Sequence, residues 1–148
     1  MVLAAWLGGC ASYRAPEFSV TEARAGARSN DGVEMFFTLD ARNDNDAALP
    51  LRDVEYRVEL DGRTVFSGTR SAEATLRRLG TQQITLPAVV RLDENAPMGA
   101  RTGGATLPYR ISGTVTYVTP GQIAEILFDG GVRGPRVGLG GEGQVALP

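Results

Sequence analysis

The chain has 148 residues, of which 43% are apolar and 22% charged, and this suits one globular domain that can bury a core. It contains no histidine and one cysteine, which excludes Ser–His and Cys–His nucleophile pairs, histidine-ligated zinc, thiolate metal cages and internal disulfides. The net charge of −2 and the scatter of the 15 basic residues, all arginine, argue against nucleic-acid binding. We therefore expect a protein that is not an enzyme and that uses no metal and no cofactor.

The chain opens with a short apolar run that ends at its cysteine. Four consecutive residues resemble a lipobox, the cleavage and lipidation signal of bacterial lipoproteins: Leu7, Gly8, Gly9 and Cys10. Residues 1–10 are therefore interpreted as a signal segment ending at a lipidated Cys10, and residues 11–16 as a tether. Because a secretory signal usually has about 15–30 residues and begins with basic ones, we expect the true start codon to lie upstream. The alternative is a short apolar N-terminus with a buried cysteine.

Lipidation of Cys10 would make a membrane the first partner of the chain. Several acyl chains anchor firmly, since each buried CH₂ contributes about 0.8 kcal/mol. The residues after the cysteine are Ala11 and Ser12 rather than Asp. By resemblance to lipoprotein sorting in enteric bacteria, this predicts a lipid-anchored protein of the bacterial cell envelope, on the periplasmic face of the outer membrane.

From residue 17 onward, apolar and polar residues alternate with a period of two, as in strands that have one face on a core and one in water. Strand-like segments fall near residues 17–24, 32–42, 52–60, 63–70, 81–91, 107–118 and 122–129. Asp61-Gly62 predicts a tight type I′ hairpin, because both positions need positive φ. About seven short strands predict an all-β fold, an antiparallel β-sandwich of the fibronectin III or immunoglobulin type.

Three segments lack the regular alternation of the strands. Residues 71–79 suit one helical turn or an edge strand, and residues 93–104 are expected to be a long loop. Residues 137–148 are expected to be a flexible glycine-rich tail. The tail matches the dinucleotide fingerprint Gly-x-Gly-x-x-Gly from residue 138, but no helix is expected after it, so nucleotide binding is not predicted.

Several short motifs follow one another in a recognisable order. Phe37-x-Leu39 precedes the turn motif, and Tyr109-x-Ile111-x-Gly113 comes late. The turn motif consists of Asn43, Asp44, Asn45, Leu49 and Pro50. This order resembles the late embryogenesis abundant (LEA) type 2 domain, also called the water stress and hypersensitive response (WHy) domain, over residues 17–136. The family usually has proline where this chain has Asp44.

The resemblance implies a fibronectin-like β-sandwich linked to desiccation and other water stress. No catalytic residues are recognised in that family, and its bacterial members often look like lipoproteins, which agrees with Cys10.

The acidic turn and the paired glutamates are the other candidate sites. A calcium loop starting at Asp44 would offer Asp46 and Glu55, but it has Leu49 where glycine is required. Asn and Asp are ordinary turn formers, so we interpret this segment as a turn with no metal. Glu55 and Glu59 share the polar face of a strand, and we expect them to be solvated rather than to catalyse hydrolysis.

Two functions stay open. The first is a non-catalytic, membrane-anchored lipoprotein that protects against desiccation or envelope stress. The alternative is an envelope interaction module that binds an unidentified protein through an edge strand or through loops, with residues 93–104 and the glycine-rich tail as candidates. Guarded sheet edges without an apolar patch favour the first function, and an open edge favours the second.

Overall fold

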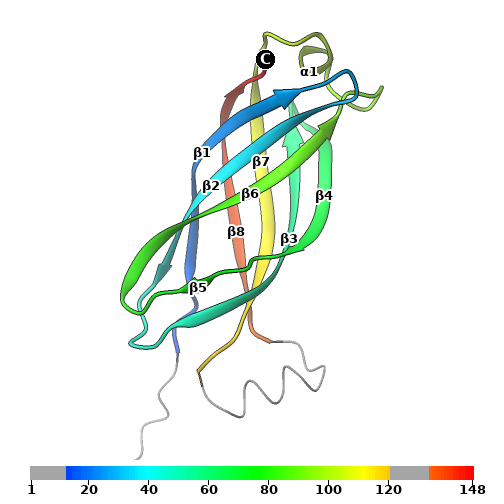
Figure 1. Ribbon diagram of the computed structural model, residues 1–148. Helices are drawn as coiled ribbons and strands as arrows, with labels where there is room; N and C mark the ends of the chain where they lie inside the picture. The colour runs from blue at the N-terminus through cyan, green and yellow to red at the C-terminus, as the bar shows by residue number, and fades with distance from the viewer. Residues whose placement is uncertain (1–12, 121–133) are drawn as a thin grey trace, which may run out of the picture.

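The computed structural model describes residues 13–120 and 134–148, whose strands form two antiparallel sheets packed face to face (Figure 1). The three-stranded sheet has the order β1 (Glu17–Arg28), β2 (Gly32–Asn43), β6 (Gly80–Arg91). The other sheet has the order β4 (Arg63–Ser71), β3 (Leu49–Leu60), β7 (Thr106–Tyr117), β8 (Arg136–Ala146), and the two-residue β5 (Thr75–Leu76) pairs with β3. The predicted all-β antiparallel sandwich is confirmed.

The core is built from the residues that the alternation assigned to it. In β2 and β3 the apolar residues of the alternating pattern are all buried: Val33, Met35, Phe37, Leu39, Ala41, Val54, Tyr56, Val58 and Leu60. Tyr109 of β7 crosses from the other sheet to meet Phe37 edge-to-face, with ring centroids 5.5 Å apart. The β3–β4 hairpin turns at Asp61 and Gly62, which both have positive φ (48° and 75°) as the type I′ turn requires.

The prediction of a flexible tail at residues 137–148 was wrong. Residues 136–146 form β8, which pairs with β7 along its whole length, so the domain runs beyond residue 136. Two of its glycines lie where a side chain would collide. A Cβ on Gly141 would lie 2.5 Å from the Cβ of Val20 in β1, and a Cβ on Gly143 would lie 3.0 Å from the Tyr109 ring. These glycines let β8 pack closely against neighbouring residues.

The expectation of a plain loop at residues 93–104 also needs correction, because Met98–Thr102 form the one-turn helix α1. The Arg28 guanidinium holds the end of this helix by donating to the carbonyls of Ala100 (2.9 Å) and Arg101 (2.6 Å). Residues 71–79 include the edge strand β5, one of the two expected alternatives. The predicted strand at 122–129 lies outside the described residues.

The sandwich is elongated, and its two ends differ in what they carry (Figure 1). Residue 13, the first described, lies at the end that also carries the β2–β3 turn. Residue 148 lies at the opposite end, beside α1. In the part of the chain that the structure describes, no helix is long and apolar enough to cross a membrane.

Candidate functional site at the N-terminal end

The Asn43–Asn45 turn is the polar centre of the N-terminal end. Asn43 occupies the next inward position after Ala41 and is completely buried. Its amide nitrogen donates to the carbonyls of Ala47 (2.9 Å) and Arg77 (3.1 Å). Its Oδ1 accepts from the backbone N–H of Asn45 (3.0 Å) and from the Asn45 amide (2.8 Å). Every hydrogen-bonding direction of this buried side chain is used, so Asn43 stabilises the turn from within.

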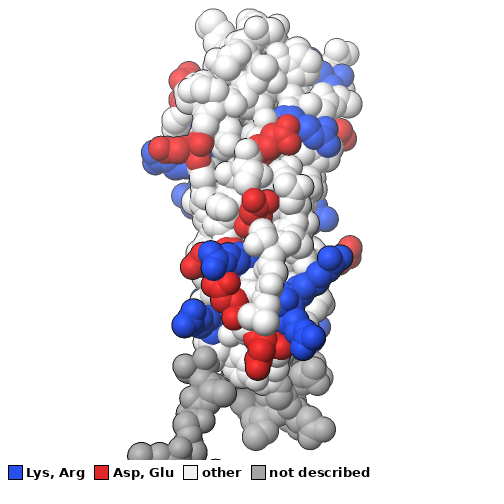
Figure 2. Space-filling model, turned by 90° about the vertical axis from the view of Figure 1, so that its left-hand side faces the viewer, with Lys and Arg blue, Asp and Glu red and all other residues white. Residues whose placement is uncertain are grey.

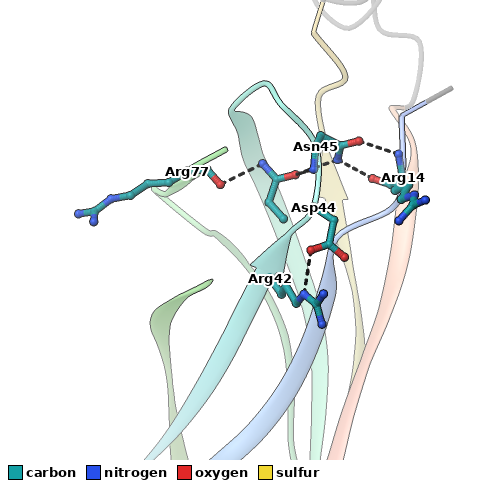
Figure 3. Close-up of polar contacts among 6 residues, drawn as sticks. Arg14, Arg42, Asp44, Asn45 and Arg77 are labelled. Atoms are coloured by element: carbon teal, nitrogen blue, oxygen red, sulfur yellow. Dashed lines mark hydrogen bonds and ion pairs between the residues drawn. The ribbon is translucent and has the colours of Figure 1, made fainter. Parts of the chain in front are cut away.

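Asn45 extends this network to two other segments (Figure 3). Its Nδ2 donates to the Arg14 carbonyl and its Oδ1 accepts from the Arg14 N–H, both at 2.8 Å. The Asn45 carbonyl accepts from the backbone N–H of Leu79 at 2.9 Å. The start of the described chain, the β2–β3 turn and residues 77–79 are therefore joined at one point.

The rest of the predicted turn motif has structural roles as well. Asp44 is exposed and accepts a hydrogen bond at 2.8 Å from Nε of Arg42. This bond raises the pKa of Arg42 above its ordinary value. Leu49 is buried and Pro50 half-buried at the start of β3, where they pair with Leu76 and Thr75 of β5. The motif thus shapes the turn and begins β3.

The lipobox residues Leu7, Gly8, Gly9 and Cys10 fall within residues 1–12, outside the described residues. In the described ranges, no group of three or more His, Cys, Asp or Glu residues could hold a metal ion. Glu55, which a calcium loop starting at Asp44 would have used, is paired with Arg136 of β8 at 2.9 Å.

The tyrosines at inward positions serve packing. The Tyr56 hydroxyl donates to the Pro87 carbonyl of β6 and so links the two sheets. Burial raises the pKa of Tyr56, Tyr109 and Tyr117 above the ordinary value of 10.0. Because each phenol is buried, its protonated form is the one that suits the folded state.

Sequence reasoning assigned no role in a site to the residues that Asn43 and Asn45 hold in place, above all the tip formed by Arg77, Arg78 and Leu79. Leu79 is 69% exposed and has a φ of 49°, an unusual conformation for a residue other than glycine. The available signal was a large apolar residue inside a short polar connection between two strands.

Comparison with known proteins shows which family has this architecture. The model of the late embryogenesis abundant protein family matches residues 38–144, well over half of the chain. The chain belongs to this family. LEA proteins of this type are associated with stress and are generally non-enzymatic. The matched region includes the Asn43–Asn45 turn and most of β8.

Solved structures share the LEA fold at low sequence identity. A solution structure of a late embryogenesis abundant protein has a TM-score of 0.68 at 20% identity, covering 90% of this chain and 72% of that one. A solution structure from Arabidopsis thaliana has a TM-score of 0.70 at 19% identity, covering 93% and 85%. A crystal structure of a protein from Archaeoglobus fulgidus has a TM-score of 0.57 at 14% identity, covering 93% and 98%. No curated protein matches the sequence.

Proposed function

We propose that this LEA protein is a non-catalytic lipoprotein, anchored through Cys10 on the periplasmic face of a bacterial outer membrane, that protects envelope components during water loss. Membership of the LEA family carries the proposal. The lipobox resemblance at residues 7–10 supports the anchor. Arg14, four positions after Cys10, is bonded to Asn45 in the β2–β3 turn, so the chain enters the sandwich at one end, and this suits an anchored domain.

The surface suits a role under drying. On the face in Figure 2, arginine and acidic side chains are interleaved rather than separated into two fields, and most lie in the half nearer the N-terminal end. A surface of mixed charge stays hydrated and resists self-association when solutes become concentrated. Such a domain can keep other proteins apart while they lose water, because it does not bind any of them tightly.

Two experiments test the proposal. For protection, a labile enzyme is dried or freeze-thawed with residues 11–148, or with an equal mass of an unrelated β-sandwich. Recovery clearly above the control supports the role, and recovery equal to the control contradicts it. For anchoring, cells are labelled with a radioactive fatty acid, and we expect label on the wild-type chain but not on the Cys10→Ser variant. An unlabelled wild-type chain would contradict the anchor.

An interaction module is the second candidate, and the exposed edge strand β4 favours it. The edge strand β6 carries Pro87, which has no N–H to offer a new strand, and β8 packs against β1 at Val20. β4 is a nine-residue edge strand whose side chains are mostly exposed. An extended peptide could pair with such an edge.

A pull-down from envelope extracts tests this second candidate. Ser67→Lys on β4 should weaken capture of a partner, because charge on an edge strand discourages pairing. Ser112→Lys on the interior strand β7 is the matched control, since both serines are exposed. Equal capture by the two variants would exclude pairing at β4.

A further inference from the structure

We propose that the tip formed by Arg77, Arg78 and Leu79 contacts the lipid surface, with Leu79 entering the interfacial layer and the two arginines binding anionic lipid phosphates. This inference rests on the proposed lipid anchor at Cys10, and it adds a second, non-covalent contact between the domain and the membrane.

The first argument is position. The Asn45 side chain holds both the N–H and the carbonyl of Arg14, while its own carbonyl holds the Leu79 N–H, so the tip is fixed beside the segment that leads to Cys10. Tyr13 lies three positions after Cys10, and an extended chain spans at most about 3.6 Å per residue. The Cys10 Cα is therefore within about 11 Å of the Tyr13 Cα. A lipid on Cys10 holds this end of the sandwich at the headgroups.

The second argument is the conformation of Leu79. This side chain is 69% exposed, so it contributes little to the core. Its φ of 49° lies in the left-handed region, which costs free energy for a leucine and which glycine or asparagine would occupy more readily. An exposed leucine in this conformation adds little to the stability of the fold. Burial in the interfacial layer of a membrane is favourable for this side chain, because it removes the exposed apolar surface from water.

The third argument is the presentation of charge. Arg77 and Arg78 are exposed, and Figure 3 shows the Arg77 side chain extending away from the Asn43–Asn45 turn. The Arg77 backbone is fixed on both sides, since its N–H donates to Gln82 Oε1 at 3.1 Å and its carbonyl accepts from Asn43. In the Asn43–Asn45 turn, Asp44 is paired with Arg42. A guanidinium on such a rigid turn suits bidentate contact with phosphate.

The test uses the full chain with Trp6→Phe, so that an introduced tryptophan is the only one. Cys10, the only cysteine, is coupled through its thiol to a maleimide lipid in vesicles that contain phosphatidylglycerol. Leu79→Trp reports on the tip. Met98→Trp is the matched control, because Met98 is also exposed (71%) but lies on α1 at the opposite end. Brominated lipids quench a tryptophan that lies in the membrane.

We expect loss of fluorescence for Leu79→Trp and no loss for Met98→Trp. The loss should shrink when Arg77→Ser and Arg78→Ser are added, or when phosphatidylcholine replaces phosphatidylglycerol. The proposal would be overturned if brominated lipid quenched both reporters equally, or neither of them. It would also be overturned if the loss for Leu79→Trp depended neither on the two arginines nor on the lipid charge. Since the maleimide supplies the lipid, this result is independent of natural lipidation. The mass of the chain isolated from bacterial membranes tests that separately.

Discussion

Replacing Asn43 with alanine should destabilise the sandwich more than any change at the exposed residues beside it. The buried side chain makes four hydrogen bonds, two as donor and two as acceptor. At a net value of about 1 kcal/mol each, their loss lowers the free energy of unfolding by about 3–4 kcal/mol. That is a large part of the roughly 5–15 kcal/mol that holds a typical domain together.

Urea denaturation of residues 11–148, followed by far-ultraviolet circular dichroism, measures this loss. With an m-value of about 2 kcal/mol/M, the midpoint of Asn43→Ala should fall by roughly 1.5–2 M. Asp44→Ala is the matched control, because it removes an exposed ion pair next to the same turn and should leave the midpoint close to that of the wild type. If the two variants shift the midpoint equally, the buried network does not hold the turn and the reasoning is wrong.

Three further predictions concern the sheets and the far end of the molecule. Gly113→Ala should unfold at a much lower urea concentration than Gly138→Ala. A Cβ on Gly113 would lie 2.2 Å from the Glu55 carbonyl oxygen, whereas a Cβ on Gly138 would have no neighbour closer than 4.0 Å. Equal urea midpoints would contradict this close approach. Burial raises the pKa of the Tyr109 phenol above 10.0. The contribution of the neutral phenol to the free energy of unfolding is therefore complete below that pH and is lost as pH rises through the pKa of the folded state. Measured up to about pH 11, the thermal midpoint should fall less steeply for Tyr109→Phe than for the wild type. Arg28→Met should speed amide hydrogen exchange in α1 and leave exchange in β3 unchanged. If α1 exchanged at the same rate in the variant and the wild type, Arg28 would not hold the helix.

The alternation of apolar residues predicted most of the fold because burial dominates strand sequences. Where glycine replaced the inward side chain, the pattern lost its signal. In β8, Val137, Leu139 and Val145 keep the inward parity, but Gly141 and Gly143 interrupt it, and so the strand was interpreted as a tail. The reason for those glycines is the close approach of Val20 and of the Tyr109 ring, which belongs to the tertiary structure and not to the local sequence.

The candidate site was predicted in part. The Asn43–Asn45 motif was identified as a turn, and the structure adds that Asn43 is completely buried. Its inward parity after Ala41 was the available signal, but asparagine is so common in turns that exposure was the simpler expectation. The link to Arg14 and Leu79 joins residues more than 30 positions apart, and no spacing rule along one strand predicts such a contact. Helix α1 is too short to show a helical period.

The placement of residues 13 and 148 at opposite ends decides how the domain carries mechanical load. β1 leads away from residue 13 and β8 leads toward residue 148, so a pull between these ends acts along both strands (Figure 1). The hydrogen bonds from β1 to β2 and from β8 to β7 lie across that direction, since antiparallel ladders bond perpendicular to the strands. All bonds of a ladder then share the tension in shear, whereas peeling would break them one after another. The strands are about 40 Å long at roughly 3.3 Å per residue. A sandwich pulled along them would resist extension.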